Sequence, residues 1–140
     1  MIKYQSEGIR KGEPLQHREA RRQVELYLLT KGRTIYDDIG YHYPPEFVRE
    51  HKLGYKFAGH SYDIVTEKEI IEIDGMNTRH SKKSQIINDQ IAEDYIRFAI
   101  EHNFMIQKHF YRLLQEEITD PQGRLLDPKD VADYLKEHLF

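Results

Sequence analysis

Two β-forming runs in the middle of the sequence constrain the fold of this chain more than any other feature. They cover residues 61–66 (SYDIVT) and 69–74 (EIIEID), and only the polar pair Glu67 and Lys68 separates them. Two extended runs joined by so short a connection predict an antiparallel β-hairpin. Gly75 follows directly and ends the second strand.

Helical patterns flank this hairpin on both sides. Residues 15–31 have Leu, Ala and Tyr side chains gathered on one side of a helix, and Gly32 stops that helix. A longer amphipathic helix runs from Ser81 to about His102, and Asn103 is its C-cap. The sequence FMIQKHFY follows as a further strand.

The C-terminal part of the chain contains a turn over residues 120–123 and a final helix, which Asp127 caps ahead of Pro128. The predicted order is therefore helix, one or more strands, hairpin, helix, strand and helix. This order predicts an α/β fold with a mixed central β-sheet flanked by helices. We expect one domain over residues 1–140, with a flexible segment at 1–13 and a C-terminal helical extension at 113–140.

Composition excludes several classes of protein. Cysteine is absent, which rules out a disulfide framework and a cysteine-based zinc site. The chain has no apolar run near the ~20 residues that a membrane-spanning helix needs. Residues 1–10 also lack the apolar stretch of a signal peptide. We therefore expect a cytoplasmic protein without a membrane partner.

The predicted hairpin carries acidic residues in an unusual place. Because side chains alternate between the two faces of a strand, Glu72 and Asp74 share one face, while Ile71 and Ile73 take the other. The tight turn can bring Asp63 of the preceding strand beside them. On a buried face these carboxylates would repel each other and be poorly solvated, a conflict that a bound divalent cation removes. Oxygen ligands alone favour Mg²⁺ or Mn²⁺.

A second interpretation of the same acidic residues needs no metal. If one face of the sheet is exposed to solvent, acidic side chains on that face are harmless. Spacing alone gives the metal site and the solvated face about equal weight.

An aspartate on one strand, then E-x-D-G at the end of the next and a histidine shortly after, resembles the PD-(D/E)xK nuclease superfamily. Among its branches the chain is most similar to the very-short-patch-repair-type endonucleases. The matching residues are Asp63, Glu72, Asp74, Gly75 and His80. Asp89 in the long helix, the turn at Asn103 and the aromatic strand after it follow the same pattern, so the resemblance covers roughly residues 15–112.

The resemblance implies a restriction-endonuclease-like core and a metal-dependent endonuclease that hydrolyses phosphodiester bonds in DNA. Asp63, Glu72 and Asp74 would hold one or two Mg²⁺ or Mn²⁺ ions, which polarise the scissile phosphate and lower the pKa of a bound water. Asp74 stands where many members carry a lysine that helps to stabilise negative charge. A second metal ion or a nearby basic residue would have to replace that cation; the candidates are His80, Lys82 and Lys83.

Family members often add an acidic residue from the first helix. Glu19 and Glu25 are the candidates in this chain. On a helical wheel Glu19 falls inside the apolar arc and Glu25 towards its edge. We therefore choose Glu19 as the additional catalytic acid.

Two groups of basic residues are candidates for binding DNA phosphates. They are Arg18 and Arg22 in the first helix, and Arg79, Lys82 and Lys83 ahead of the long helix. A basic cluster is more often a solvated face than a nucleic-acid footprint, and the net charge of the chain is −3. A non-catalytic nucleic-acid-binding protein on the same fold is therefore the alternative function, and an interaction protein with a solvated acidic face is a third. The resemblance also makes a homodimer a candidate assembly.

Overall fold

A computed structural model of the chain describes residues 12–36, 40–42, 47, 59–75 and 83–140. Its helices are α1 (Leu15–Thr30), α3 (Lys83–Glu101), the short 3₁₀ helix η2 (Gln115–Glu117) and α4 (Pro128–His138). Its strands are β1 (Ile35–Tyr36), β2 (Gly40–His42), β3 (Gly59–Ser61), β4 (Ile64–Thr66), β5 (Glu69–Asp74) and β6 (His109–Leu114). Most of the segment predicted to be flexible, residues 1–11, lies outside the described residues.

The central sheet is mixed. It contains four strands in the order β1-β4-β5-β6, and β2 pairs with β3 in a separate two-stranded sheet. β4 is antiparallel to both β1 and β5, whereas β6 runs parallel to β5. A parallel neighbour needs a crossover connection, which α3 provides. The predicted α/β fold with a mixed sheet flanked by helices is confirmed.

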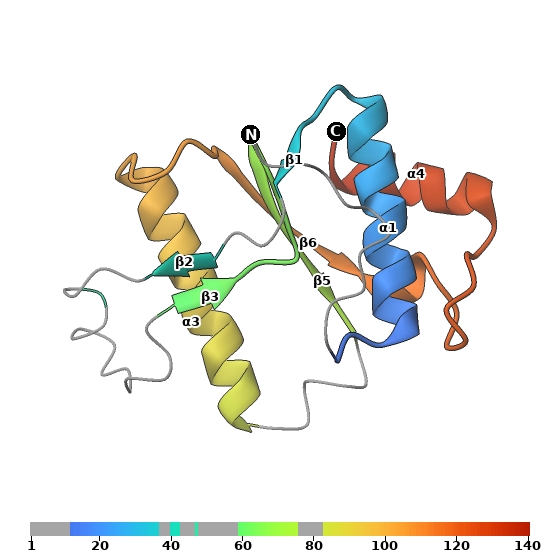
Figure 1. Cartoon of the computed structure of the whole chain (residues 1–140), viewed down its shortest axis with the longest axis horizontal. Coiled ribbons are helices and arrows are strands. Elements are labelled where there is room, and N and C mark those ends of the chain that lie inside the picture. Colours follow the sequence, from blue (N-terminus) through green and yellow to red (C-terminus); the bar gives the residue numbers. More distant parts are fainter. Residues whose placement is uncertain (1–11, 37–39, 43–46, 48–58, 76–82) are drawn as a thin grey trace.

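Helices cover both faces of this sheet. α1 and α4 lie together on one side, and α3 lies on the other (Figure 1). Ile71 and Ile73 of β5 pack with α1 and α4, while Val65 and Ile70 pack with α3. The interpretation of the acidic strand as one solvated face is therefore wrong, because Glu72 is only 4% exposed.

The β4–β5 hairpin is confirmed, with Ile64 opposite Ile71 and Val65 opposite Ile70. The predicted first strand, residues 61–66, is nevertheless two strands. β3 ends at Ser61 and pairs with β2, and β4 begins only at Ile64. The chain bends at Asp63, whose side chain accepts a hydrogen bond from a backbone N–H of β5.

Helix α1 starts at the predicted residue and ends one residue earlier than predicted, at Thr30, but it buries a different face. The prediction that Leu15, Leu26 and Leu29 lie on the core side is wrong, since all three are exposed, although Ala20 of the same predicted group is buried. The buried residues follow helical spacing along another stripe: His17, Ala20, Arg21, Val24, Glu25 and Leu28. Three of these side chains are polar, so the buried stripe has no apolar periodicity in the sequence.

The C-terminal half agrees with the sequence in its caps and differs in one strand. Asn103 has a positive φ of 57° after α3, and the Asp127 side chain accepts hydrogen bonds at the start of α4. The strand predicted at residues 104–111 begins later, at His109, because β5 begins at Glu69 and offers no earlier partner. α4 is part of the main core, to which it contributes Val131 and Leu135. No helix in the described part of the chain is long and apolar enough to cross a bilayer.

Candidate functional site

The acidic residues predicted from the sequence lie at the end of β5, where the hairpin holds two of them together. The backbone N–H of Asp63 donates to Glu72 Oε1 at 2.8 Å, and the N–H of Ile73 donates to Asp63 Oδ2 at 2.8 Å. Both acidic residues are buried, at 8% and 4% exposed. The bend at Asp63 therefore brings its carboxylate to the edge of β5, beside Glu72.

A histidine of α1, His17, contacts the carboxylate of Asp63. Nε2 of His17 lies 3.4 Å from Asp63 Oδ1 and 3.2 Å from the backbone oxygen of Ile73. Nδ1 of His17 lies 2.5 Å from Oε2 of Glu13, which precedes α1. We call this chain of Glu13, His17 and Asp63 the inner bridge. It joins α1 to the hairpin through one imidazole between two carboxylates.

Further ionic contacts along α1 support the inner bridge. Arg21 donates from Nε and Nη2 to the two carboxylate oxygens of Glu13, at 3.0 and 2.9 Å. Its Nη1 donates to Glu25 Oε1 at 2.6 Å. Burial by itself would lower the pKa of His17, but its contacts with Asp63 and Glu13 outweigh burial and raise the pKa to about 9. Burial would raise the pKa of Glu13, yet His17 and Arg21 lower it to about 2.

Asp74, the third predicted acid, has a different partner. Nη1 of Arg112 on β6 lies 3.1 and 2.8 Å from the two carboxylate oxygens of Asp74. Nε of Arg112 donates to Glu93 Oε1 of α3 at 2.5 Å, and its Nη2 donates to the backbone oxygen of Asp89. We call the chain of Glu93, Arg112 and Asp74 the outer bridge. It joins α3 to β5 and β6 on the other face of the sheet.

Glu93 and Arg112 of the outer bridge are held in their charged forms by each other. Burial opposes the charge on both Glu93 and Arg112, but their mutual hydrogen bond and attraction lower the pKa of Glu93. Contacts with Glu93 and Asp74 raise the pKa of Arg112 above its ordinary value. The side chain of Arg112 is 29% exposed, so its positive charge is accessible from solvent.

The residue types at this edge suit a hard cation, because all three predicted ligands are carboxylates. Their arrangement does not assemble a three-ligand site: Asp74 is bound by Arg112, and Asp63 by Ile73 N and His17. Among the described residues, no group of three or more His, Asp or Glu side chains is placed to hold a metal ion. Coordination would require at least Asp74 to exchange its arginine partner for the ion.

The remaining predicted site residues lie apart from this edge or outside the described residues. Glu19 is half-buried and accepts hydrogen bonds from Arg22 and Gln23 of its own helix, so its expected position in the core is wrong. The buried glutamate of α1 is Glu25, at 2% exposed. Arg18 is also half-buried on α1. The other basic candidates cannot be located: Arg79, His80 and Lys82 lie outside the described residues, and only the backbone of Lys83, at the start of α3, is described.

Sequence reasoning missed the residues that surround the acidic edge, namely Glu13, His17 and Arg112. The signal in the sequence for His17 was the spacing of polar residues along α1, where His17, Arg21 and Glu25 follow one another at intervals of one turn. Arg112 carried no signal of its own, because its partner Asp74 is 38 residues away in the chain.

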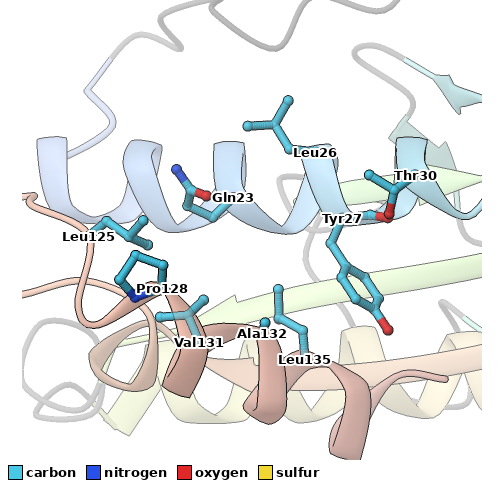
Figure 2. Close-up of a pocket in the computed structure, with 9 residues that line it drawn as sticks. All are labelled: Gln23, Leu26, Tyr27, Thr30, Leu125, Pro128, Val131, Ala132 and Leu135. Atoms are coloured by element: carbon cyan, nitrogen blue, oxygen red, sulfur yellow. The ribbon is translucent and has the colours of Figure 1, made fainter.

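A separate hollow of about 210 Å³ lies between α1 and α4, away from the acidic edge (Figure 2). Six of its lining residues are Gln23, Leu26, Tyr27, Val131, Ala132 and Leu135. No charged side chain and no histidine lines the hollow, and the hydroxyl of its tyrosine, Tyr27, donates to the backbone oxygen of Phe140.

The chain was compared with known proteins at the level of families, curated sequences and solved structures. No family model, no curated protein and no solved structure matches it.

Proposed function

We propose that this chain is a metal-dependent endonuclease that hydrolyses phosphodiester bonds in DNA. The observation that carries the proposal is the buried acidic pair at the end of β5, where the backbone N–H of Asp63 donates to the Glu72 carboxylate at 2.8 Å. Buried carboxylates beside each other are unfavourable unless a cation or a hydrogen-bond donor compensates them, and such pairs occur often at functional sites. The mixed sheet flanked by helices is compatible with the core that the sequence resemblance implies.

In this proposal Asp63 and Glu72 are the ligands for Mg²⁺ or Mn²⁺, and a bound ion would polarise the scissile phosphate. Arg112 has a separate role. Its guanidinium carries a permanent positive charge beside Asp74, at the position where many members of the resembled family have lysine. A half-exposed cation at this edge can stabilise negative charge that develops on a phosphate.

A second function is favoured by the partners of the acidic residues. Asp74 is bound to Arg112, and Asp63 to Ile73 N and His17, so protein groups already compensate the charges that a metal would neutralise. A protein that binds nucleic acid on this fold without cutting it would need no metal. Arg112 would then serve as a phosphate contact only.

One assay separates these two functions. The parent protein and Glu72→Gln are incubated with circular single-stranded and double-stranded DNA in the presence of Mg²⁺ or Mn²⁺. The amide of Gln is isosteric and can still accept from Asp63 N, so the fold is kept while the charge is lost. We expect cutting by the parent and a fall of about 100-fold or more in the variant, equivalent to roughly 3 kcal/mol of barrier.

The matched control is Glu67→Gln, which removes a carboxylate from the turn of the same hairpin, where Oε2 accepts from Thr34 N. This variant should cut as the parent does. DNA binding without cutting under either metal would contradict the nuclease and support the binding protein.

A further inference from the structure

His17 contacts other polar groups through both of its ring nitrogens. Nδ1 contacts Glu13 at 2.5 Å, and Nε2 contacts Asp63 at 3.4 Å and the backbone oxygen of Ile73 at 3.2 Å. The side chain is 8% exposed. Its ring can therefore neither turn nor leave without breaking contacts to Glu13 and to the hairpin.

Further ionic contacts connect the Glu13 end of the inner bridge to α1. Glu25, Arg21, Glu13, His17 and Asp63 form a chain of alternating charges that runs from the middle of α1 to the end of β5. Replacement of a buried ionic chain by apolar residues is often neutral or stabilising, so stability alone is weak grounds for such an arrangement. A chain of fixed charges that ends on one carboxylate does, however, define the orientation of that carboxylate.

The two oxygens of Asp63 are held from two directions. Oδ2 accepts from Ile73 N, and Oδ1 faces Nε2 of His17. The backbone N–H of Asp63 donates to Glu72, so a rotation at Asp63 would also disturb Glu72. His17 therefore controls the geometry of the acidic pair, although it lies on a different element.

We propose that His17 is a positioning residue for Asp63 in the cleavage of DNA, with Glu13 fixing its far nitrogen. This inference rests on the proposed nuclease function. His17 itself touches no substrate; it sets the plane of the Asp63 carboxylate that would hold the metal ion, as groups behind a metal ligand commonly do.

The test uses His17→Leu, which removes the contact to Asp63, and His17→Gln, whose amide N–H reaches about as far as imidazole Nε2. Cutting of circular DNA with Mg²⁺ is measured over a range of DNA concentrations, at a temperature where circular dichroism shows each variant folded. We expect kcat of His17→Leu to fall by about 10- to 100-fold with KM little changed, and His17→Gln to recover most of the loss.

The matched control is Arg33→Met. Arg33 makes a comparable two-point contact with the buried Glu69 at the opposite end of β5, through Nε and Nη2 at 2.9 Å each. This variant should lose stability and keep the parent kcat. An equal fall in kcat for Arg33→Met would overturn the inference, because the effect would then follow stability and not position.

Three other results are equally decisive. An unchanged kcat in His17→Leu overturns the positioning role while the nuclease proposal stands.

If His17→Leu does not fold, Glu13→Gln is used in its place. A fall in kcat of about tenfold in Glu13→Gln supports the inference, and an unchanged kcat overturns the inference. If the parent protein cuts no DNA with either metal, the nuclease proposal fails and the positioning role is overturned with it.

Discussion

The inner and outer bridges join the end of β5 to helices on opposite faces of the sheet, and each holds one cation between two carboxylates. The inner bridge places His17 between Glu13 and Asp63, with side chains 5–11% exposed. The outer bridge places Arg112 between Glu93 and Asp74, with side chains 14–29% exposed. The same pattern of charges therefore occurs once inside the protein and once near its surface.

This difference in burial separates what the two bridges can do. Buried charges interact strongly, because little water screens them, and each one left without a partner is costly. Charges near the surface interact weakly but can exchange partners with solvent or with a ligand. The inner bridge is therefore suited to fixing geometry, and the outer bridge to meeting a phosphate or an ion.

The largest effect should come from breaking the inner bridge. His17→Leu leaves Glu13 and Asp63 buried without their shared cation, so we expect the free energy of unfolding to fall by about 3–5 kcal/mol. Urea unfolding followed by circular dichroism measures this change. A loss below about 1 kcal/mol, the usual range of a surface pair, would contradict the distinction between the two bridges.

The inner bridge should also give stability a particular pH dependence. The pKa of His17 is raised to about 9, so its contribution is complete below the ordinary value of 6.5 and is lost as pH rises through 9. The pKa of Glu13 is lowered to about 2, so its contribution is present above 4.5 and is lost as pH falls towards 2. The bridge is therefore strongest between these ordinary values.

The alkaline half of this profile is the easier to measure. Between pH 6.5 and 9.5 we expect the parent to lose on the order of 3 kcal/mol through His17. His17→Gln carries no titrating ring and should lack this part of the decline. The free energy of unfolding is measured with urea at each pH. If it declined equally with pH in the parent and in His17→Gln, His17 would not keep its proton through the inner bridge.

Breaking the outer bridge should cost less. Arg112→Met removes charged hydrogen bonds at a half-exposed position, and we expect a loss of about 1–2 kcal/mol in the same unfolding experiment. Arg97→Met is the matched control, because Arg97 also donates to Glu93 and lies over the ring of Phe110, but it does not contact Asp74. The control should change stability by less than about 0.5 kcal/mol. If Arg112→Met and Arg97→Met lowered the free energy of unfolding equally, the contact between Arg112 and Asp74 would contribute nothing to stability.

The smallest effect concerns salt. The Debye length falls from about 10 Å at 0.1 M to about 3 Å at 1 M salt, and screening acts mainly on charges that solvent reaches. The loss caused by Arg112→Met should therefore shrink by a few tenths of a kcal/mol in 1 M NaCl, while the loss caused by His17→Leu stays the same. If the stability loss of His17→Leu shrank in 1 M NaCl as much as that of Arg112→Met, the inner bridge would not be shielded from salt, contrary to its burial.

The parts of the fold that the sequence predicts are those encoded locally. The β4–β5 hairpin follows from two β-forming runs and a short turn, and the cap at Asp127 from the residues next to it. The start of β6 was not predictable from its own residues, because it depends on where β5 offers a partner.

The candidate site was predicted only in part for the same reason. Asp63 and Glu72 belong to one hairpin, so their neighbourhood follows from strand pairing. His17 is 56 residues from Ile73, which its ring contacts, and only the docking of α1 on the sheet brings them together. Glu19 was preferred because leucines suggested the buried side of α1, whereas polar residues that satisfy each other occupy much of that side.

The position of β5 between an antiparallel and a parallel neighbour has a consequence for the order of folding. β4 is only a short turn away, but β6 can pair only after the whole of α3 has crossed the sheet. Contacts between distant segments form late, because the loop between them must first be closed. We expect pulse-labelled hydrogen exchange to protect the amides of Ile64 and Ile71, which face each other in the hairpin, before those of β6. Asp63 and Glu72 would then come together before Arg112 reaches the sheet, and the chain would pass through a stage in which Asp74 has not yet met the cation that compensates it.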